Sequence, residues 1–306
     1  MLRTCLFLFL LFLYSIAHTQ TKYDSKEYTQ QLELRHDNDF FTFTDRYYSS
    51  GILFTYRTIL KKGVFGDTEQ LSLRLGQEVY TPSQTQSTNS NEFDRPYAGY
   101  TGFTGNWSFA QDNSLYDLGV SIGLVGNNSG AGGFQRWYHR VVAILNSPLW
   151  IDELNNSFHV NFHAIYTKEW EWSPNPFGVR AAVQPKLAIG SRDIFAETEG
   201  ILFFGRRNSI GESTAYNRLG SNAREIYFTV RLAYRQVFYN GLLEGNLFGD
   251  NSTVLRESRS SLLRFGMDFN HRFDRNDYKI GIRYNSPETP ESSSHIYLQF
   301  SYGFAF

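Results

Sequence analysis

A glutamine and a histidine lie one helical turn apart in a segment with helical periodicity. Gln135 and His139 occupy positions i and i+4, so their side chains are neighbours on one flank of a helix expected over residues 134–145. The apolar face of this helix comprises Phe134, Trp137, Tyr138, Val141, Val142 and Leu145, with Arg136 and Arg140 opposite. Because a neutral imidazole accepts a proton near neutral pH, His139 is a candidate general base. The alternative is an amphipathic lid that carries a solvated histidine.

A short acidic run offers oxygen ligands for a metal ion. Asp37, Asn38 and Asp39 carry the hard oxygen donors that Ca²⁺ takes, although their spacing differs from that of an EF-hand loop, and water or backbone oxygens would have to complete the shell. Such a run is also common in ordinary turns. Beside a histidine base, however, it suggests the hydrolysis of an ester, with a metal that polarises the carbonyl group and stabilises the oxyanion.

The elements that would position these residues are strands of alternating polarity. In the last strand the apolar positions are Ile296, Leu298, Phe300, Tyr302, Phe304 and Phe306, and residues 118–124 and 226–234 follow the same rule. Alternating segments of about ten residues with aromatic ends are typical of outer-membrane barrels. The strands of a soluble β-sandwich also alternate in polarity, but that fold does not require a final strand that ends on an aromatic residue such as Phe306. The sequence therefore favours an all-β fold, a transmembrane antiparallel β-barrel.

About twelve strands are expected, and an even number suits a closed bacterial barrel. Their approximate ranges are residues 28–37, 49–60, 69–80, 100–110, 116–125, 158–171, 178–189, 194–204, 224–236, 258–272, 277–286 and 294–306. With both termini in the periplasm, short inner turns are expected at residues 61–68, 111–115, 171–175 and 273–277. Long outer connections are expected at residues 37–48, 81–99 and 126–157. The segment 205–223 disagrees with this scheme, because it is long and falls on the inner side.

The N-terminal residues are typical of a secretory signal peptide. Arg3 precedes an apolar stretch over residues 6–16, and small residues suited to cleavage follow it. We therefore assign residues 1–19 to the signal and residues 20–306 to a single barrel domain. The apolar stretch is shorter than the roughly 20 residues that a membrane helix needs. The only cysteine, Cys5, falls inside the signal, so a disulfide in the mature chain is not expected.

The composition excludes one class of function. The chain has 29 Lys and Arg against 30 Asp and Glu, a formal net charge of −1, whereas a nucleic-acid binder carries a strongly basic surface. Aromatic residues make up 17% of the chain and charged residues only 19%, which argues against disorder.

Four segments at the outer ends of the expected strands resemble one enzyme family. They are Asn38-Asp39, Asp45-Arg46-Tyr47-Tyr48-Ser49-Ser50-Gly51, Asp94-Arg95-Pro96-Tyr97-Ala98-Gly99, and Gly126 through Gln135-Arg136-Trp137-Tyr138-His139-Arg140. In this order they are similar to the outer-membrane lipid A 3′-O-deacylases of the LpxR type, over essentially the whole mature chain. The Gln-x-x-x-His helix after a glycine-rich turn is the most specific part of the resemblance.

The resemblance implies a twelve-stranded barrel in the bacterial outer membrane, with its active site on the extracellular rim. It implies a Ca²⁺-dependent hydrolase that removes the 3′-linked acyloxyacyl group from lipid A, the membrane anchor of lipopolysaccharide. Carried over by position, His139 is the base that activates water, and Asp39 is the carboxylate associated with the metal. Asn38, Gln135 and the hydroxyl group of Ser49 complete the polar site.

The chain departs from the pattern of that family in two places. Ser49 stands where the characterised members have a threonine, which keeps the hydroxyl group. Residues 81–91 contain no lysine or arginine, although those members place a lysine in the second outer loop. We therefore expect the headgroup of the lipid to be bound by Arg95, Arg136 or Arg140.

Other classes of function stay open at the level of sequence. A barrel with a polar lumen could be a small outer-membrane channel or a structural barrel without catalysis. A soluble secreted hydrolase is the third alternative, which the amphipathic last strand disfavours. For the enzyme we expect lipid A or a related lipid as partner, no nucleic acid, and a monomer. Aromatic belt positions are expected for Tyr47, Tyr48, Tyr97, Tyr100, Trp170 and Trp172.

Overall fold

The computed structural model describes residues 28–39, 46–61, 63–65, 68–142 and 146–306. The expected signal peptide at residues 1–19 and the last part of the expected helix, residues 143–145, lie outside the described residues.

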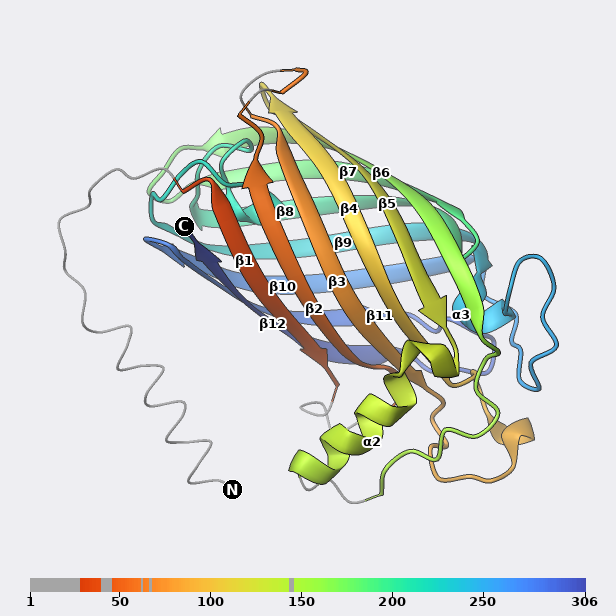
Figure 1. Ribbon diagram of the computed structural model, residues 1–306. Helices are drawn as coiled ribbons and strands as arrows, with labels where there is room; N and C mark the ends of the chain where they lie inside the picture. Colours follow the sequence, from red (N-terminus) through yellow and green to blue (C-terminus); the bar gives the residue numbers. More distant parts are fainter. Residues whose placement is uncertain (1–27, 40–45, 62, 66–67, 143–145) are drawn as a thin grey trace.

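The described residues form a closed antiparallel barrel in which each strand pairs with its neighbours in sequence and β1 pairs with β12 (Figure 1). The twelve strands are β1 (Gln30–Asn38), β2 (Tyr47–Ile59), β3 (Gln70–Thr81), β4 (Ala98–Gln111), β5 (Ser114–Val125), β6 (Ser157–Ser173), β7 (Val179–Gly190), β8 (Asp193–Arg206), β9 (Glu225–Asn240), β10 (Ser261–Phe273), β11 (Asn276–Asn285) and β12 (His295–Ala305). The expected fold class is confirmed. Each expected strand matches an observed one, and the largest difference is at the end of β9, which extends to Asn240 rather than to residue 236.

Helices are short and lie between strands. They are α2 (Ala131–Val142), α3 (Gly241–Glu244) and the 3-10 turns η2 (Ser90–Glu92), η3 (Asn127–Ser129) and η4 (Thr214–Tyr216). The amphipathic helix expected in the third outer loop is α2, and it begins three residues earlier than expected. Gly130, which separates η3 from α2, has a φ of 71°, a left-handed conformation that favours glycine. Among the described residues, no helix has the length and apolarity needed to cross a membrane.

Strand alternation separates a polar lumen from an apolar outward face. Arg57 of β2 points into the lumen and donates hydrogen bonds to Gln31 Oε1 at 2.8 Å and to Glu33 Oε1 at 3.0 Å. The intervening residues of β1, Leu32 and Leu34, point away from the lumen and are exposed. An exposed outward face of this kind is stable in contact with lipid rather than water.

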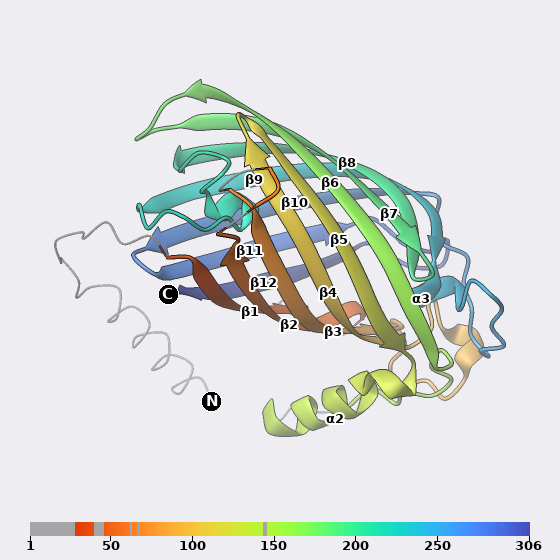
Figure 2. The same cartoon turned by 45° about the horizontal axis from the view of Figure 1, so that its top comes forward.

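The two ends of the barrel carry different elements. One, which we call the terminal end, holds the last residue, Phe306, and the short turns between β4 and β5 and between β10 and β11. The opposite end, which we call the helix end, holds α2 and the connecting residues 82–97, 126–130, 146–156 and 241–260. Figures 1 and 2 both show α2 outside the barrel wall, and α2 contacts β3 and β4.

The connection between β8 and β9, residues 207–224, folds into the lumen at the terminal end. This connection contains η4 and no strand, so the long inner segment hides no miscounted strand. Arg218 donates to Ser108 Oγ on the opposite wall at 2.7 Å, and Arg272 donates to the carbonyl oxygen of Arg218 at 2.9 Å. The buried carboxylate of Glu225 accepts three further hydrogen bonds from the connection. Residues 207–224 therefore fill this end of the barrel, and we call them the plug.

Between the plug and the helix end, the lumen holds a cavity of about 490 Å³. Its walls carry paired charges, such as Arg231 and Asp268 at 2.9 Å. Towards the helix end, Arg192 forms an ion pair with Glu78 at 2.6 Å and lies 3.9 Å from the ring centre of Tyr100. Packed polar and aromatic side chains thus lie on both sides of the cavity.

Candidate functional site

The pairing of β2 with β3 shifts by one residue at Ser49. Tyr48 pairs with Tyr80 and Ser50 pairs with Val79, so Ser49 is the extra residue of a β-bulge. A bulge interrupts the alternation of sides and re-aims the side chain that it carries. The Ser49 side chain is nearly completely buried at this position.

Two tyrosines before the bulge hold it in place. Tyr47 has a φ of 60°, a left-handed conformation that is unusual for a bulky residue. Its hydroxyl group donates to Asp94 Oδ2 and accepts from the Ser293 amide, both at 2.8 Å. The hydroxyl group of Tyr48 donates to Asp37 Oδ2 at 2.8 Å. These tyrosines anchor the start of β2. Tyr47, Tyr97 and Tyr100 are buried, so the expectation that they belong to an exposed aromatic belt is wrong.

Asp37 is separate from the two residues that follow it. Its carboxylate accepts hydrogen bonds from Arg35 Nε at 2.9 Å and Arg35 Nη2 at 2.6 Å, and Arg35 lines the luminal cavity. Because successive side chains of a strand point to opposite sides, Asn38 faces away from the lumen. Of the acidic run, Asn38 therefore faces outward, and Asp39 follows the last residue of β1.

The end of β1 lies directly beside the bulge. Asn38 pairs with Ser50, and the backbone amide of Asp39 donates to the carbonyl oxygen of Ser49 at 3.3 Å. The Asp39 side chain is buried, with 1% of its surface exposed, and its Oδ2 accepts a hydrogen bond from the Arg46 amide at 3.0 Å. The backbone at Asn38 and Asp39 thus lies directly beside Ser50 and Ser49 of β2.

Helix α2 is seated on the outward face of β3 and β4. The hydroxyl group of Thr101 and the amide of Gln77 both donate to the carbonyl oxygen of Ser129, at 2.7 Å and 2.9 Å. Gly99 allows the close approach, because a Cβ atom at that position would overlap the side chains of Ser129 and Ala131. The start of the helix is therefore fixed to the barrel wall.

Gln135 joins the helix to the bulge. Its Nε2 lies 3.3 Å from Ser49 Oγ, and its Oε1 accepts a hydrogen bond from Trp150 Nε1 at 2.6 Å. An indole N–H only donates, so this bond fixes the orientation of the amide and turns its NH₂ group towards Ser49. Trp150 is itself stacked on Tyr97, with ring centres 5.2 Å apart.

His139 lies one turn further along α2 and is buried, with 4% of its surface exposed. The preceding residue, Tyr138, contacts His36 on the outward face of β1, with ring centres 6.2 Å apart. Burial raises the pKa of the Tyr138 phenol, which therefore stays protonated. Arg136 and Arg140 are exposed. The contacts of Gln135 with Ser49 and of Tyr138 with His36 thus place this part of α2 against the outward face of the wall rather than in the lumen.

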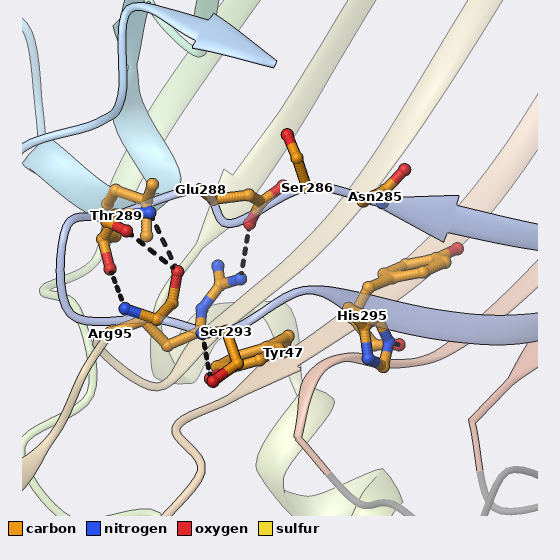
Figure 3. Close-up of a pocket in the computed structure, with 11 residues that line it drawn as sticks. Tyr47, Arg95, Asn285, Ser286, Glu288, Thr289, Ser293 and His295 are labelled. Atoms are coloured by element: carbon orange, nitrogen blue, oxygen red, sulfur yellow. Dashed lines mark hydrogen bonds and ion pairs between the residues drawn. The ribbon is translucent and has the colours of Figure 1, made fainter. Parts of the chain in front are cut away.

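Arg95 lies in a separate small pocket at the same end of the barrel (Figure 3). Its Nη1 is 2.9 Å from Glu288 Oε2, and its guanidinium group lies 4.6 Å from the ring centre of Tyr80. Only 2% of its surface is exposed. This burial distinguishes Arg95 from the exposed pair Arg136 and Arg140, which are better situated for contact with a headgroup.

The donors at the site are compatible in chemistry with a hard cation. Asp39, Asn38 and Ser49 supply oxygen atoms, which suit Ca²⁺ better than Zn²⁺. One of the two lone pairs of the Gln135 oxygen atom already accepts from Trp150. In the described part of the chain, no three His, Cys, Asp or Glu side chains form a cluster. Asp39 would therefore be the principal charged ligand, with backbone and water oxygens beside it.

Sequence reasoning did not find Trp150 or the structural role of Tyr47. Trp150 follows α2 in an irregular segment, where no periodicity indicates which residue it meets. The run Asp94 to Gly99 marked the region of Tyr97, on which Trp150 stacks, but not that contact.

A closed twelve-stranded antiparallel barrel with an apolar outward face defines a transmembrane β-barrel protein. Residues 5–306 match the model of the family described as "Outer membrane protein LpxR", and the chain belongs to this family. Its barrel is therefore one of the bacterial outer membrane.

Among solved structures, the chain is similar to LpxR from Salmonella typhimurium, with a TM-score of 0.75 and 17% identity over 90% of this chain and 100% of that one. It also matches the β domain of the Bordetella autotransporter BrkA, with a TM-score of 0.46 and 11% identity over 92% of this chain and 100% of that one. No curated protein matches the sequence.

Proposed function

We propose that this chain is an outer-membrane esterase that removes an ester-linked acyl group, the 3′-acyloxyacyl group, from lipid A or a related lipid. The observation that carries the proposal is the hydrogen bond between Gln135 and Ser49, which holds the helix of His139 against the bulge of β2. Membership of the LpxR family supports a lipid A deacylase. The helix end then faces the cell exterior, and the site lies on its rim.

His139 acts as the general base in this proposal. Its imidazole takes a proton from a water molecule, whose oxygen attacks the carbonyl carbon of the ester. The bond between that carbon and the sugar oxygen then breaks, and the proton passes to the sugar oxygen, so that a fatty acid and an alcohol are released. Gln135 keeps the helix in place and orients Ser49, whose hydroxyl group is a hydrogen-bond partner in the site.

Asp39 and Asn38 would hold the cation at the end of β1. A bound Ca²⁺ would supply positive charge for the oxyanion of the transition state. Asp39 is suited to this role because its carboxylate is buried and its Oδ2 already accepts a hydrogen bond from the Arg46 amide. This bond keeps the carboxylate in one orientation.

The lipid would reach the site sideways, from the outer leaflet. Ser49 and His36 lie on the outward face of the wall, beneath α2, so a lipid needs no passage through the lumen. Arg136 and Arg140 are exposed on the helix and would attract the phosphate groups of lipopolysaccharide. Because the barrel has no open strand edge, a monomer is sufficient.

A channel is not the function that these features favour. The luminal cavity lies between the plug and the packed layer of Arg192, Glu78 and Tyr100. Gln135 and Ser49, whose contact defines the candidate site, lie outside the lumen instead.

The test is mass spectrometry of lipid A treated with the purified protein in detergent with Ca²⁺. We expect loss of the mass of one acyloxyacyl group with the wild type, and a rate 10²- to 10⁴-fold lower with His139→Ala, as expected for loss of a general base. His271→Ala is the matched control, because His271 lies on β10 at the terminal end, away from the site. A folded wild-type barrel that leaves lipid A unchanged would refute the proposal.

A further inference from the structure

A second histidine lies close to the candidate base, and the mechanism does not use it. His36 precedes Asn38 by two residues on β1 and contacts Tyr138 of α2 at 6.2 Å between ring centres. It faces outward, since its neighbour Arg35 lines the luminal cavity. The Nε2 atom of His36 is buried and has no hydrogen-bond partner. Buried polar atoms are nearly always paired, so this nitrogen needs an explanation.

Among the described residues, a second histidine on the outward face gives a comparison. His271 of β10 also has a buried Nε2 without a partner. Its ring lies near Phe273 and Tyr278, in the aromatic surroundings of the terminal end. His36 differs in that a helix covers it and the candidate site adjoins it. Its unpaired nitrogen therefore lies beside the candidate site, next to α2.

The path of an acyl chain leads past His36. An ester held near His139 and Asp39 lies at the rim, so its chain must run along the outward face towards the interior of the bilayer. The next outward residue of β1 is Leu34, which pairs with Phe54 of β2, and both are exposed and apolar. With a rise of about 3.4 Å per residue, His36 lies about 7 Å from Asn38 along the strand. His36 is thus the polar residue of β1 between the site and an apolar wall.

We propose that Nε2 of His36 hydrogen-bonds to an oxygen atom that the acyl chain carries beside the scissile ester. Chains of that chemistry are 3-hydroxyacyl and 3-acyloxyacyl groups, in which a hydroxyl or a second ester lies on the third carbon. An unsubstituted chain has no atom to pair with this nitrogen and leaves it buried and unpaired, which disfavours binding. His36 is therefore a specificity-determining residue, and the inference rests on the proposed function of the site.

The test compares two synthetic glucosamine esters of equal chain length, one with a 3-acyloxy substituent and one with a plain chain. We expect the wild type to prefer the substituted ester by about 10-fold in kcat/KM, the effect of one buried hydrogen bond. His36→Leu removes this preference, and His36→Gln, which keeps an N–H donor, restores most of it. His271→Leu leaves the preference unchanged.

The outcomes separate this inference from the proposed function. Hydrolysis of neither ester by the wild type would refute the proposed function and the inference together. Hydrolysis with an equal loss for both esters in His36→Leu would overturn the inference and leave the proposed function standing. Heat-modifiable migration on gels reports the folding of each variant, and His36→Phe, which keeps a ring against Tyr138, decides the question if His36→Leu does not fold.

Discussion

The side-chain amide of Gln135 lies 3.3 Å from the hydroxyl group of Ser49, a residue 86 positions earlier in the chain. This contact joins the only long helix of the described residues to a bulge in the barrel wall. Because Gln135 precedes His139 by one helical turn, the contact also fixes the rotation of α2 about its axis. His139 is accordingly buried instead of exposed to solvent.

Loss of the Trp150 hydrogen bond should weaken this arrangement. In Trp150→Phe the ring still stacks on Tyr97, but Gln135 Oε1 loses its donor and the amide can rotate. We expect the rate of ester hydrolysis to fall about 10-fold with an intact barrel, the effect of one buried hydrogen bond. Trp137→Phe on the exposed face of α2 is the control and should retain the wild-type rate. Equal rates for the two variants would show that the indole does not orient the amide.

The close contact between the start of α2 and the barrel wall at Gly99 gives a second prediction. A Cβ atom in Gly99→Ala overlaps the side chains of Ser129 and Ala131, so the start of the helix has to move away from the wall. We expect a large loss of hydrolysis with unchanged heat-modifiable migration. Gly133→Ala is the matched control, because nothing lies within 4 Å of its added Cβ and alanine favours the helix. Activity in Gly99→Ala equal to that of the control would show that the close approach of α2 to Gly99 is not needed for hydrolysis.

The sequence was sufficient to predict the barrel because alternation is a local property. In each strand, residues that face outward, such as Leu34, alternate with residues that face the lumen, such as Glu33. The turns between strands are short at one end of the barrel. The bulge at Ser49 escaped prediction, since only Tyr47 and Tyr48 precede it in β2 and two residues are too few to reveal a break in the alternation. The plug escaped it because residues 207–224 are held by scattered luminal partners such as Ser108.

The candidate site was predictable in part. The helix spacing of Gln135 and His139 places both on one flank, and the structure brings Gln135 to Ser49. Their catalytic roles stay predictions, as does the metal. The burial of Arg95 depends on Glu288, almost two hundred residues away, and no local pattern reports such a pair.

The plug should be separable from the site. Glu225→Ala leaves the Asn208 amide, the Ser213 hydroxyl and the Thr214 amide without their acceptor, at a cost of about 1–3 kcal/mol for each buried donor. We expect residues 207–224 to become sensitive to trypsin while hydrolysis continues, because the site lies at the other end of the barrel. Glu212→Ala, at an exposed position of the plug, should resist trypsin as the wild type does. Protection of both variants would show that Glu225 does not hold the plug.

The role of the metal separates water attack from an acyl-serine route. If Ca²⁺ carries the charge of the oxyanion, a chelator should stop hydrolysis and added Ca²⁺ should restore it. Asp39→Ala should lose nearly all activity, because Asp39 is the buried carboxylate beside the bulge. Ser49→Ala should retain a reduced rate, because it removes one hydrogen-bond partner and not the base.

An acyl-serine route predicts the opposite order of effects. Ser49 would then form a covalent ester with the acyl group, so Ser49→Ala would be inactive and the intermediate could be trapped and weighed by mass spectrometry. Ser49 Oγ accepts a hydrogen bond from the NH₂ group of Gln135, and that group cannot accept the proton of a nucleophile, so this route needs another group as its base. Full activity in excess chelator, or an acyl group found on Ser49, would therefore replace the metal hypothesis with a covalent one.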